Sequence, residues 1–247
     1  MWAKDVFLRR WPRPYATARE TYHGFLRLSE TWLLGTWLHE WRWRSAAPLA
    51  AAEFEQQVAH PHRHFLVDRL MRRMPLERML EVGCHTGQNL MLLGRQMPTV
   101  QFTGVDINPR FVATGRTWCA RDGLDNVRLD VAAADDLRRF GEREFDLTFT
   151  DATLIYLGPD KIERALQEIV RVTRRAVLFN EWGLDHAESG ETSRWYGRHW
   201  VHNYRSLMRP YARDAEIRVV PVPPGLWAPG GGWERYGCLV EVQLTER

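Results

Sequence analysis

Lysine is nearly absent from this 247-residue sequence, because Lys4 and Lys161 are the only two and arginine supplies the rest of the positive charge. The formal net charge is only +3. Proteins that bind nucleic acid usually concentrate basic residues on one element, and no stretch of this sequence does so. We therefore expect no nucleic-acid partner.

Cysteine is also scarce. Cys84, Cys119 and Cys238 are far apart and form no Cys-x-x-Cys pair. Their odd number and spacing indicate neither a disulfide framework nor a zinc site. A reducing, cytoplasmic location is the expectation that follows.

Long apolar runs are missing as well. No run approaches the roughly 20 residues that a transmembrane helix needs. The N-terminal residues include charged side chains, and no uninterrupted apolar segment of the kind found in signal peptides follows them. We expect no membrane span and no signal peptide.

The sequence from residue 77 onward alternates short apolar runs with helical stretches, which is typical of βαβ units and a mostly parallel sheet. A Pro- and Gly-rich stretch, residues 221–233, joins the last two expected strands, which we expect to be antiparallel. Residues 195–208 have a helical pattern. Strands are expected at residues 78–82, 100–105, 126–131, 145–150, 176–179, 215–222 and 237–245.

The most informative segment is residues 79–90, Met-Leu-Glu-Val-Gly-Cys-His-Thr-Gly-Gln-Asn-Leu. An expected strand ends near Glu81, Gly83 allows a ligand to approach the backbone, and Gly87 opens a helix whose free N–H groups face the ligand. Asp106 ends the next strand, where a carboxylate can accept both hydroxyl groups of a ribose. This arrangement indicates a nucleotide-type ligand.

These residues resemble the class I S-adenosylmethionine-dependent methyltransferases, whose first motif reads acid-x-Gly-x-Gly-x-Gly and whose second strand ends in a ribose-binding acid. The resemblance spans about residues 77–181. It implies a Rossmann-like, doubly wound seven-stranded α/β sheet with an antiparallel last strand in residues 76–247. His85 departs from the pattern, because the family has its middle glycine there.

The resemblance also implies which residues hold S-adenosylmethionine. The turn after the first strand would hold the methionine end, Asp106 the ribose and Ile107 one face of the adenine. The family usually has an acid beside the adenine, but the matching place here falls on two alanines, so the acid is either missing or replaced by Asp135. The residues implied for the cofactor are Glu81, Gly83, His85, Gly87, Asp106, Ile107, Ala133 and Ala134.

The turn has two other interpretations. A dinucleotide-binding fold needs Gly-x-Gly-x-x-Gly, whereas this turn reads Gly-x-x-x-Gly after an acid. A catalytically inactive, cofactor-binding interaction protein stays open as an alternative, because His85 and the missing adenine acid depart from the family. We favour an active methyltransferase.

The segment 145–157 lacks the Asn/Asp-Pro-Pro-Tyr motif of enzymes that methylate nucleobase amines or glutamine side chains. It resembles the corresponding segment of small-molecule methyltransferases. The predicted reaction is therefore methylation of a hydroxyl group on a small molecule, a sugar or a secondary metabolite. Transfer to nitrogen or carbon of a small molecule is the alternative.

Acidic side chains follow two adjacent strands of the predicted sheet, at the edge where open α/β sheets bind ligands. The divalent-metal-dependent O-methyltransferases have acids and an amide at such places, so Asp151, Asn180 and Glu181 could hold Mg²⁺. In a metal-free site, Asp151, Glu181 or His199 would act as the general base, in that order of preference. Both versions stay open.

The segment after the fifth strand commonly contributes to the acceptor pocket in this family. His199 and His202 would share one face of the helix expected there. His60-Pro-His-Arg-His64 could chelate a metal, but it precedes an expected helix and we interpret it as the entry to that helix. The residues predicted to contact the small-molecule acceptor are Tyr156, Trp182, Tyr196, His202 and Tyr204.

Tryptophan is abundant, and six of the 12 lie within the first 43 residues. Residues 31–44 place leucine and tryptophan at helical spacing. We interpret residues 1–75 as an N-terminal helical extension with three open roles: a cap that builds the acceptor pocket, an interface for a homodimer, or a helix at a membrane surface. The cap and the interface are favoured.

Overall fold

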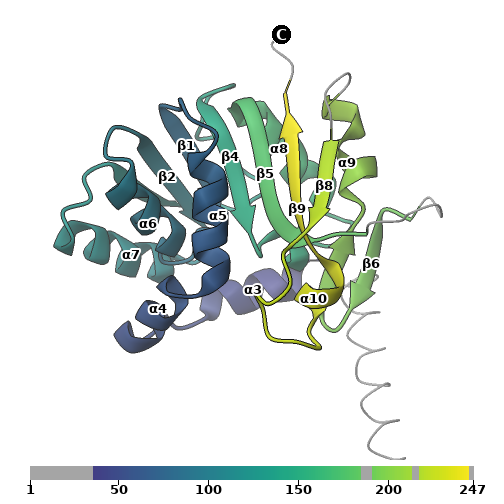
Figure 1. The fold of residues 1–247 in the computed structure, drawn as a ribbon, viewed down its shortest axis with the longest axis horizontal. Coiled ribbons are helices and arrows are strands. Elements are labelled where there is room, and N and C mark those ends of the chain that lie inside the picture. The colour runs from purple at the N-terminus through teal and green to yellow at the C-terminus, as the bar shows by residue number, and fades with distance from the viewer. Residues whose placement is uncertain (1–35, 185–190, 213–216, 245–247) are drawn as a thin grey trace, which may run out of the picture.

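The computed structural model describes residues 36–184, 191–212 and 217–244 (Figure 1). A seven-stranded sheet in the order β3-β2-β1-β4-β5-β9-β8 forms its centre. Neighbouring strands from β3 to β5 are parallel, and β9 is antiparallel to both β5 and β8. The predicted fold is confirmed. The strands are β1 (Arg78–Val82), β2 (Gln101–Asp106), β3 (Val127–Val131), β4 (Phe145–Asp151), β5 (Thr173–Trp182), β8 (Ile217–Pro221) and β9 (Gly237–Gln243).

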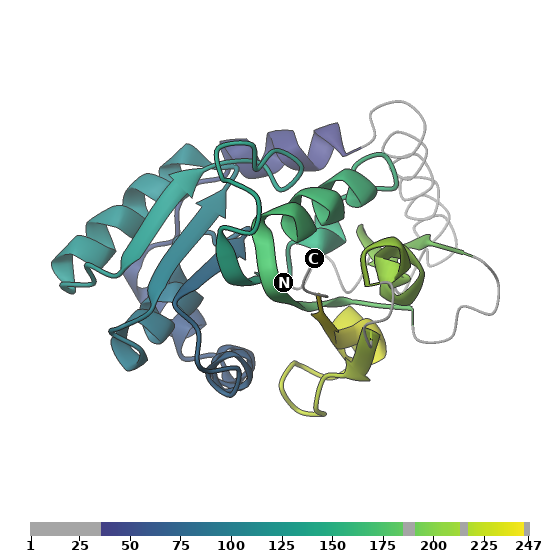
Figure 2. The same cartoon turned by 90° about the horizontal axis from the view of Figure 1, so that it is seen from above.

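Helices cover both faces of the sheet (Figure 2), so that two hydrophobic cores form. The core on one face takes buried side chains from α5, α6 and α7, and the core on the other face takes them from α8 and α9. The strands β1, β4 and β5 are thereby buried on both sides over most of their length, as their apolar sequences require. The helices are α5 (Pro61–Met71), α6 (Gln88–Gln96), α7 (Pro109–Arg121), α8 (Ile162–Val172) and α9 (Tyr204–Ala212).

The start of α7 shows how the sequence determines a helix boundary. The side chain of Asn108 accepts hydrogen bonds from the backbone N–H groups of Arg110 and Phe111, and Pro109 occupies the first helical position. This combination of an N-cap and a proline is what the sequence predicted. It places Asp106 and Ile107 directly before the helix, at the carboxyl edge of the sheet.

Three short helices precede the sheet: α3 (Trp37–Ser45), α4 (Ala51–Val58) and α5. They confirm the helical prediction for the part of residues 1–75 that the structure describes. Residues 1–35 lie outside the described residues. Because Leu66 and Leu70 of α5 share a core with Leu90 of α6, α5 packs as part of the same body. The division at residue 75 and the homodimer stay predictions.

The predicted helix over residues 195–208 is wrong in its first half. β6 (Ser193–Tyr196) and β7 (His199–His202) form a two-stranded antiparallel hairpin, and α9 begins only at Tyr204. Gly197 and Arg198 both have positive φ angles, 56° and 87°. This conformation is typical of the two-residue turns that join the strands of a hairpin. His199 and His202 therefore lie at the two ends of a strand and not on one helix face.

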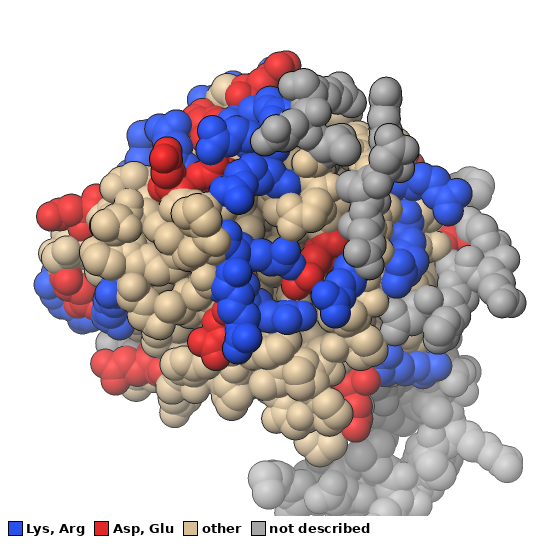
Figure 3. Space-filling model, turned by 45° about the horizontal axis from the view of Figure 1, so that its top comes forward, with Lys and Arg blue, Asp and Glu red and all other residues tan. Residues whose placement is uncertain are grey.

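The connection between β8 and β9 contains the short helix α10 (Gly232–Tyr236), and the two strands are antiparallel as predicted. No helix within the described ranges is long and apolar enough to cross a membrane. Figure 3 shows basic side chains gathered around acidic ones on one face of the molecule. Among the described residues, Arg69 and Arg73 pair with Glu241. The charges of these two arginines are thus partly neutralised.

Candidate active site

A cavity of about 440 Å³ lies at the carboxyl edge of β1, β2 and β4. The turn after β1 and the ends of β2 and β4 form one end of it, which we call the sheet end. Aromatic side chains from α3, the 3₁₀ helix η2 (Leu154–Tyr156) and the β8–β9 connection form the other, which we call the aromatic end. The predicted site residues that line the cavity are Glu81, Gly83, His85, Asp106, Ile107, Ala134, Asp151 and Tyr156.

Several predicted site residues do not line this cavity. Gly87 caps α6 in a left-handed conformation (φ 85°) next to Leu129. Ala132, and not Ala133, lines the cavity together with Ala134. The other predicted residues that are not part of the lining are Asn180, Glu181, Trp182, Tyr196, His199, His202 and Tyr204.

The turn after β1 is tied to the neighbouring strands. The backbone N–H groups of Gly83 and Cys84 donate to the carbonyl of Val105, at 2.7 and 2.9 Å. Gly83 has a φ of 79°, and a Cβ there would overlap the side chain of Thr153. Gly83 lines the cavity, and its missing Cβ also makes room for the loop after β4.

Asp106 lies at the end of β2 and faces the cavity. Its two oxygens accept backbone N–H groups, Oδ2 from His85 at 2.9 Å and Oδ1 from Asn108 at 2.8 Å. Burial raises the pKa of Asp106 to about 6, although these hydrogen bonds act in the opposite direction. A carboxylate held this way has lone pairs left for the two hydroxyl groups of a ribose.

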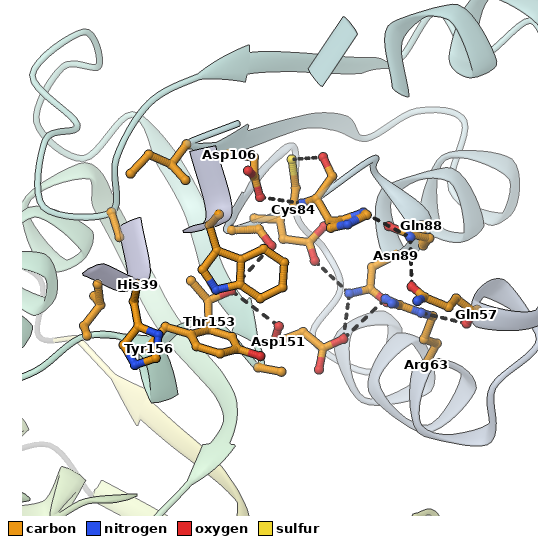
Figure 4. A pocket seen from close by; sticks show the side chains of 18 of the residues that line it. His39, Gln57, Arg63, Cys84, Gln88, Asn89, Asp106, Asp151, Thr153 and Tyr156 are labelled. Atoms are coloured by element: carbon orange, nitrogen blue, oxygen red, sulfur yellow. Dashed lines mark hydrogen bonds and ion pairs between the residues drawn. The ribbon is translucent and has the colours of Figure 1, made fainter. Parts of the chain in front are cut away.

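A hydrogen-bonded network crosses the floor of the cavity (Figure 4). The amide nitrogen of Asn89 donates to Glu81 at 2.7 Å and to Asp151 at 3.0 Å, and Arg63 donates to the amide oxygen of Asn89 at 2.9 Å. Burial raises the pKa of Glu81 to about 8. Its second oxygen, Oε2, is buried without a hydrogen-bond partner in the described residues, so Glu81 is able to receive a cationic ligand group.

Asp151 is surrounded by donors. Its Oδ2 contacts His62 at 3.2 Å, Arg63 at 3.4 Å and Asn89 at 3.0 Å, while Oδ1 accepts from the amide of Asn180 at 2.8 Å. Burial alone would raise the pKa of Asp151, but the hydrogen bond with His62, together with the charge of Arg63, holds it well below its usual range. Asp151 is therefore ionised and a poor proton acceptor.

The predicted Mg²⁺ site does not fit this arrangement. Asn180 turns its amide nitrogen toward Asp151, and Glu181 accepts the backbone N–H groups of Thr153 and Ile155 at 2.9 and 3.2 Å. A metal would require carboxylate and amide oxygens converging on one point. Across the parts of the chain that the structure describes, no three His, Cys, Asp or Glu side chains form such a group.

Two histidines that sequence reasoning treated only as a helix entry lie in the cavity wall. His62 bridges Asp151 and His60: its Nε2 is 3.2 Å from Oδ2 of Asp151, and its Nδ1 is 2.6 Å from Nδ1 of His60. The indole of Trp227 stacks on His62 at 4.3 Å. The clustered histidines of residues 60–64 were the available sequence signal, but nothing local linked them to a residue 89 positions away.

Ring stacking organises the aromatic end. Trp43 of α3 lies edge-on to Tyr156 of η2 at 4.9 Å, and His39 approaches the same tyrosine at 5.7 Å (Figure 4). Behind Tyr156, His199 contacts both Tyr156 and Trp182, at 5.2 and 4.8 Å. His199 and Trp182 thus support the cavity wall and are not part of its lining.

His202 and Tyr204 were predicted to contact the acceptor and are core residues instead. His202 is fully buried, with Nε2 at 3.2 and 3.0 Å from the carbonyl oxygens of Leu154 and Leu157. Tyr204 packs in the core beside Phe179. These two positions differ from the prediction because residues 193–202 form a hairpin and α9 begins only at Tyr204.

Comparison with known proteins gives matches over the same region. Residues 79–176 match the family model described as a methyltransferase domain. Trans-aconitate 2-methyltransferase of Escherichia coli is 32% identical over 110 residues, which cover 40% of this chain and 40% of that protein. The chain therefore spans about two fifths of the length of the curated relatives it matches.

Solved structures share the fold at lower identity. The [4+2]-cyclase SpnF superimposes with a TM-score of 0.59 at 21% identity, covering 74% of this chain and 82% of that one. A methyltransferase from Aquifex aeolicus described as SAM-dependent gives 0.56 at 15% identity, covering 80% and 100%. Likeness at these identities concerns the fold alone, and the chemistry must be argued from the site.

Proposed function

Residues 79–176 form a class I S-adenosylmethionine-dependent methyltransferase domain, and on this premise we propose that the protein methylates an oxygen atom of a small hydroxylated molecule, a sugar or a secondary metabolite. The observation that carries the proposal is the single cavity, in which the turn after β1 and the aromatic end line the same space. Group transfer requires donor and acceptor to be held together in a defined orientation.

The sheet end fits the cofactor. S-adenosylmethionine, when bound, supplies a methyl group on a positively charged sulfur. Asp106 would accept the ribose hydroxyl groups, Glu81 would pair with the ammonium group through its unpartnered oxygen, and Arg63 would bind the carboxylate. Ile107 and Ala134 offer apolar contacts for the adenine, as expected from the missing acid.

The aromatic end fits the acceptor. Trp43, Tyr156 and Trp227 present flat apolar surfaces with polar edges to the cavity, which suit the faces of a sugar or an aromatic ring. Of the residues predicted to contact the acceptor, Tyr156 alone is part of the lining in the described ranges. The specificity of the reaction would therefore depend on α3, η2 and the β8–β9 connection.

We propose His60 as the general base in place of Asp151, Glu181 and His199. Because Asp151 is ionised, its contact with His62 requires a proton on Nε2 of His62. The proposed role requires that His62 carry no proton on Nδ1, so that Nδ1 accepts and the proton of the 2.6 Å contact lies on Nδ1 of His60. Nε2 of His60 is left unprotonated, and it can accept the hydroxyl proton of the acceptor.

The surroundings of His60 support this assignment. Burial is the main cause that lowers the pKa of His60, which favours the neutral ring that a general base needs. With its proton on Nδ1, His60 still makes the 2.6 Å hydrogen bond to His62. Nδ1 of His60 can then no longer accept the backbone N–H of His62, which lies 3.4 Å away. Asp151 is then a positioning residue, which orients His62 and stabilises the positive charge that develops on the histidine pair.

Calorimetric titration with S-adenosylmethionine, followed by transfer of a labelled methyl group to a panel of small hydroxylated molecules, tests the proposal. We expect binding below millimolar cofactor and label in an ether product. No binding at millimolar cofactor would remove the methyltransferase function. Binding with label only on nitrogen or carbon would replace oxygen as the accepting atom, and binding without transfer to any acceptor would favour an inactive cofactor-binding protein.

A further inference from the structure

His85 occupies the place of the middle glycine in a strained conformation. Its φ is 52°, in the left-handed region that residues with a β-carbon rarely adopt. Such strain persists where the surrounding structure enforces it, and it gathers at binding sites. The ring packs on Phe111 with centroids 3.8 Å apart and lines the cavity. The turn therefore presents an imidazole where a glycine would leave empty space.

The hydrogen bonds of His85 define its tautomer. Nδ1 lies 3.4 Å from the amide nitrogen of Gln88 and 3.2 Å from the hydroxyl of Thr86. An amide nitrogen can only donate, so Nδ1 is an acceptor. Burial lowers the pKa of His85 to about 4, and the neutral ring carries its one proton on Nε2. Within the described ranges no residue accepts a hydrogen bond from that N–H group.

The neighbours of His85 place it between two parts of the cofactor site. Its backbone N–H binds Asp106 at 2.9 Å, at the proposed ribose position. On its other side Gln88 donates to the side chain of Gln57 at 3.2 Å, and the backbone carbonyl of Gln57 accepts from Arg63 at 2.8 Å. His85 thus lies between the proposed ribose acceptor and the residues that contact the proposed carboxylate-binding arginine.

We infer that His85 is a cofactor-positioning residue whose Nε2–H group donates a hydrogen bond to the carboxylate of the methionine part of S-adenosylmethionine. The inference rests on the proposed function of the site. A neutral donor directs the carboxylate without placing a second full positive charge near the sulfonium, as an arginine or lysine would. The departure from the family's glycine is, on this view, an added contact.

The test compares two ligands on three proteins by calorimetry. S-adenosylmethionine carries the carboxylate, and 5′-methylthioadenosine has the same nucleoside without the amino-acid part. For His85→Gly we expect the affinity for S-adenosylmethionine to fall about tenfold, the usual effect of losing one hydrogen bond to a charged group. The affinity for 5′-methylthioadenosine should change less than about twofold, because a ligand without the carboxylate loses nothing.

His85→Asn is the matched variant. Asparagine tolerates the left-handed conformation and keeps an N–H donor, so it should recover part of the lost affinity. Equal affinity of the wild-type and His85→Gly proteins for S-adenosylmethionine would overturn the inference, as would an equal loss for both ligands. A wild-type protein that binds neither ligand overturns the proposed function and this inference with it.

Discussion

The two ends of the cavity are built in different ways. At the sheet end, Glu81 and Asp106 come from two neighbouring parallel strands, and the turn that joins β1 to α6 lies between them. At the aromatic end, Trp43, Tyr156 and Trp227 come from three segments that are far apart in the sequence. The topology of the sheet alone brings the first group together. The second group depends on how segments outside the parallel strands dock on it.

The docking of α3 links the two ends. Thr36, directly before α3, donates to the carboxylate of Asp160 through both its backbone N–H (2.9 Å) and its hydroxyl (2.7 Å). The amide of Asn108 donates to the carbonyl oxygens of Trp43 and Ala46, at 2.7 and 3.0 Å. Because Asn108 follows Asp106 by two residues, the position of Trp43 is tied directly to the strand end that would hold the ribose.

The largest effect should come from the histidine pair, and it should separate catalysis from cofactor binding. We expect His60→Gln to lower kcat by about 100- to 1000-fold, the usual contribution of a general base, while the affinity for S-adenosylmethionine is unchanged. Steady-state kinetics and calorimetry measure the two quantities. His64→Gln is the control, because His64 is exposed on the same helix.

An unchanged kcat in His60→Gln would show that no proton passes through this residue. The acceptor atom would then be a carbon, a nitrogen or an oxygen that is already ionised. The cavity would in that case contain no separate site for proton transfer.

The next largest effect concerns the sheet end. Asp106→Ala removes both acceptors for the ribose, and we expect the affinity for S-adenosylmethionine to fall about 100-fold, or about 3 kcal/mol. Asp106→Asn keeps one acceptor oxygen and should lose less. Thermal unfolding of each variant separates this loss from damage to the turn, because Asp106 also accepts the backbone N–H of His85. Full affinity in Asp106→Ala would contradict the ribose assignment.

The sequence predicted the sheet end well for a physical reason. Strand ends, a positive-φ turn and a capped helix are local features, and the parallel order of the strands places them at one edge. Asp106, Ile107 and Asp151 therefore line the cavity as expected. The Mg²⁺ site stays a prediction, and sequence order could not reveal that the amide nitrogen of Asn180 donates to Asp151.

The aromatic end could not be predicted in the same way. The sequence predicts a helix over residues 195–208, where the hairpin of residues 193–202 lies in part. Its aromatic and histidine residues also suit a helical period, and the two-residue turn at Gly197 and Arg198 carries only one glycine. His62 reaches Asp151 across 89 residues. Contacts of this range depend on tertiary packing, and no motif in the sequence encodes them.

Binding at the sheet end should depend on pH through Glu81. Its pKa of about 8 means that the carboxyl group is mostly protonated at pH 7. An ammonium group bound beside it favours the ionised form and lowers its pKa, so that binding releases a proton and affinity rises with pH. We expect calorimetry to show about a fivefold gain in affinity for S-adenosylmethionine from pH 7 to pH 8.

Two controls isolate this carboxyl group. The gain should vanish in Glu81→Gln, which cannot ionise, and it should be absent for 5′-methylthioadenosine, which has no ammonium group. A pH-dependent gain that survives in Glu81→Gln would assign the proton to another group at this end.

The smallest effect should come from Trp227, and it should affect the acceptor alone. Its indole stacks on His62 at 4.3 Å and on Trp233 at 4.5 Å, so the β8–β9 connection closes over the histidine pair by ring contacts. We expect Trp227→Ala to raise the KM for the acceptor about threefold, the usual strength of one aromatic contact, and Trp227→Phe to stay near wild type. Calorimetry should show the same affinity for S-adenosylmethionine in all three proteins. A matching loss of cofactor affinity would mean that the connection holds both ligands, and the two ends of the cavity would then act as one binding unit.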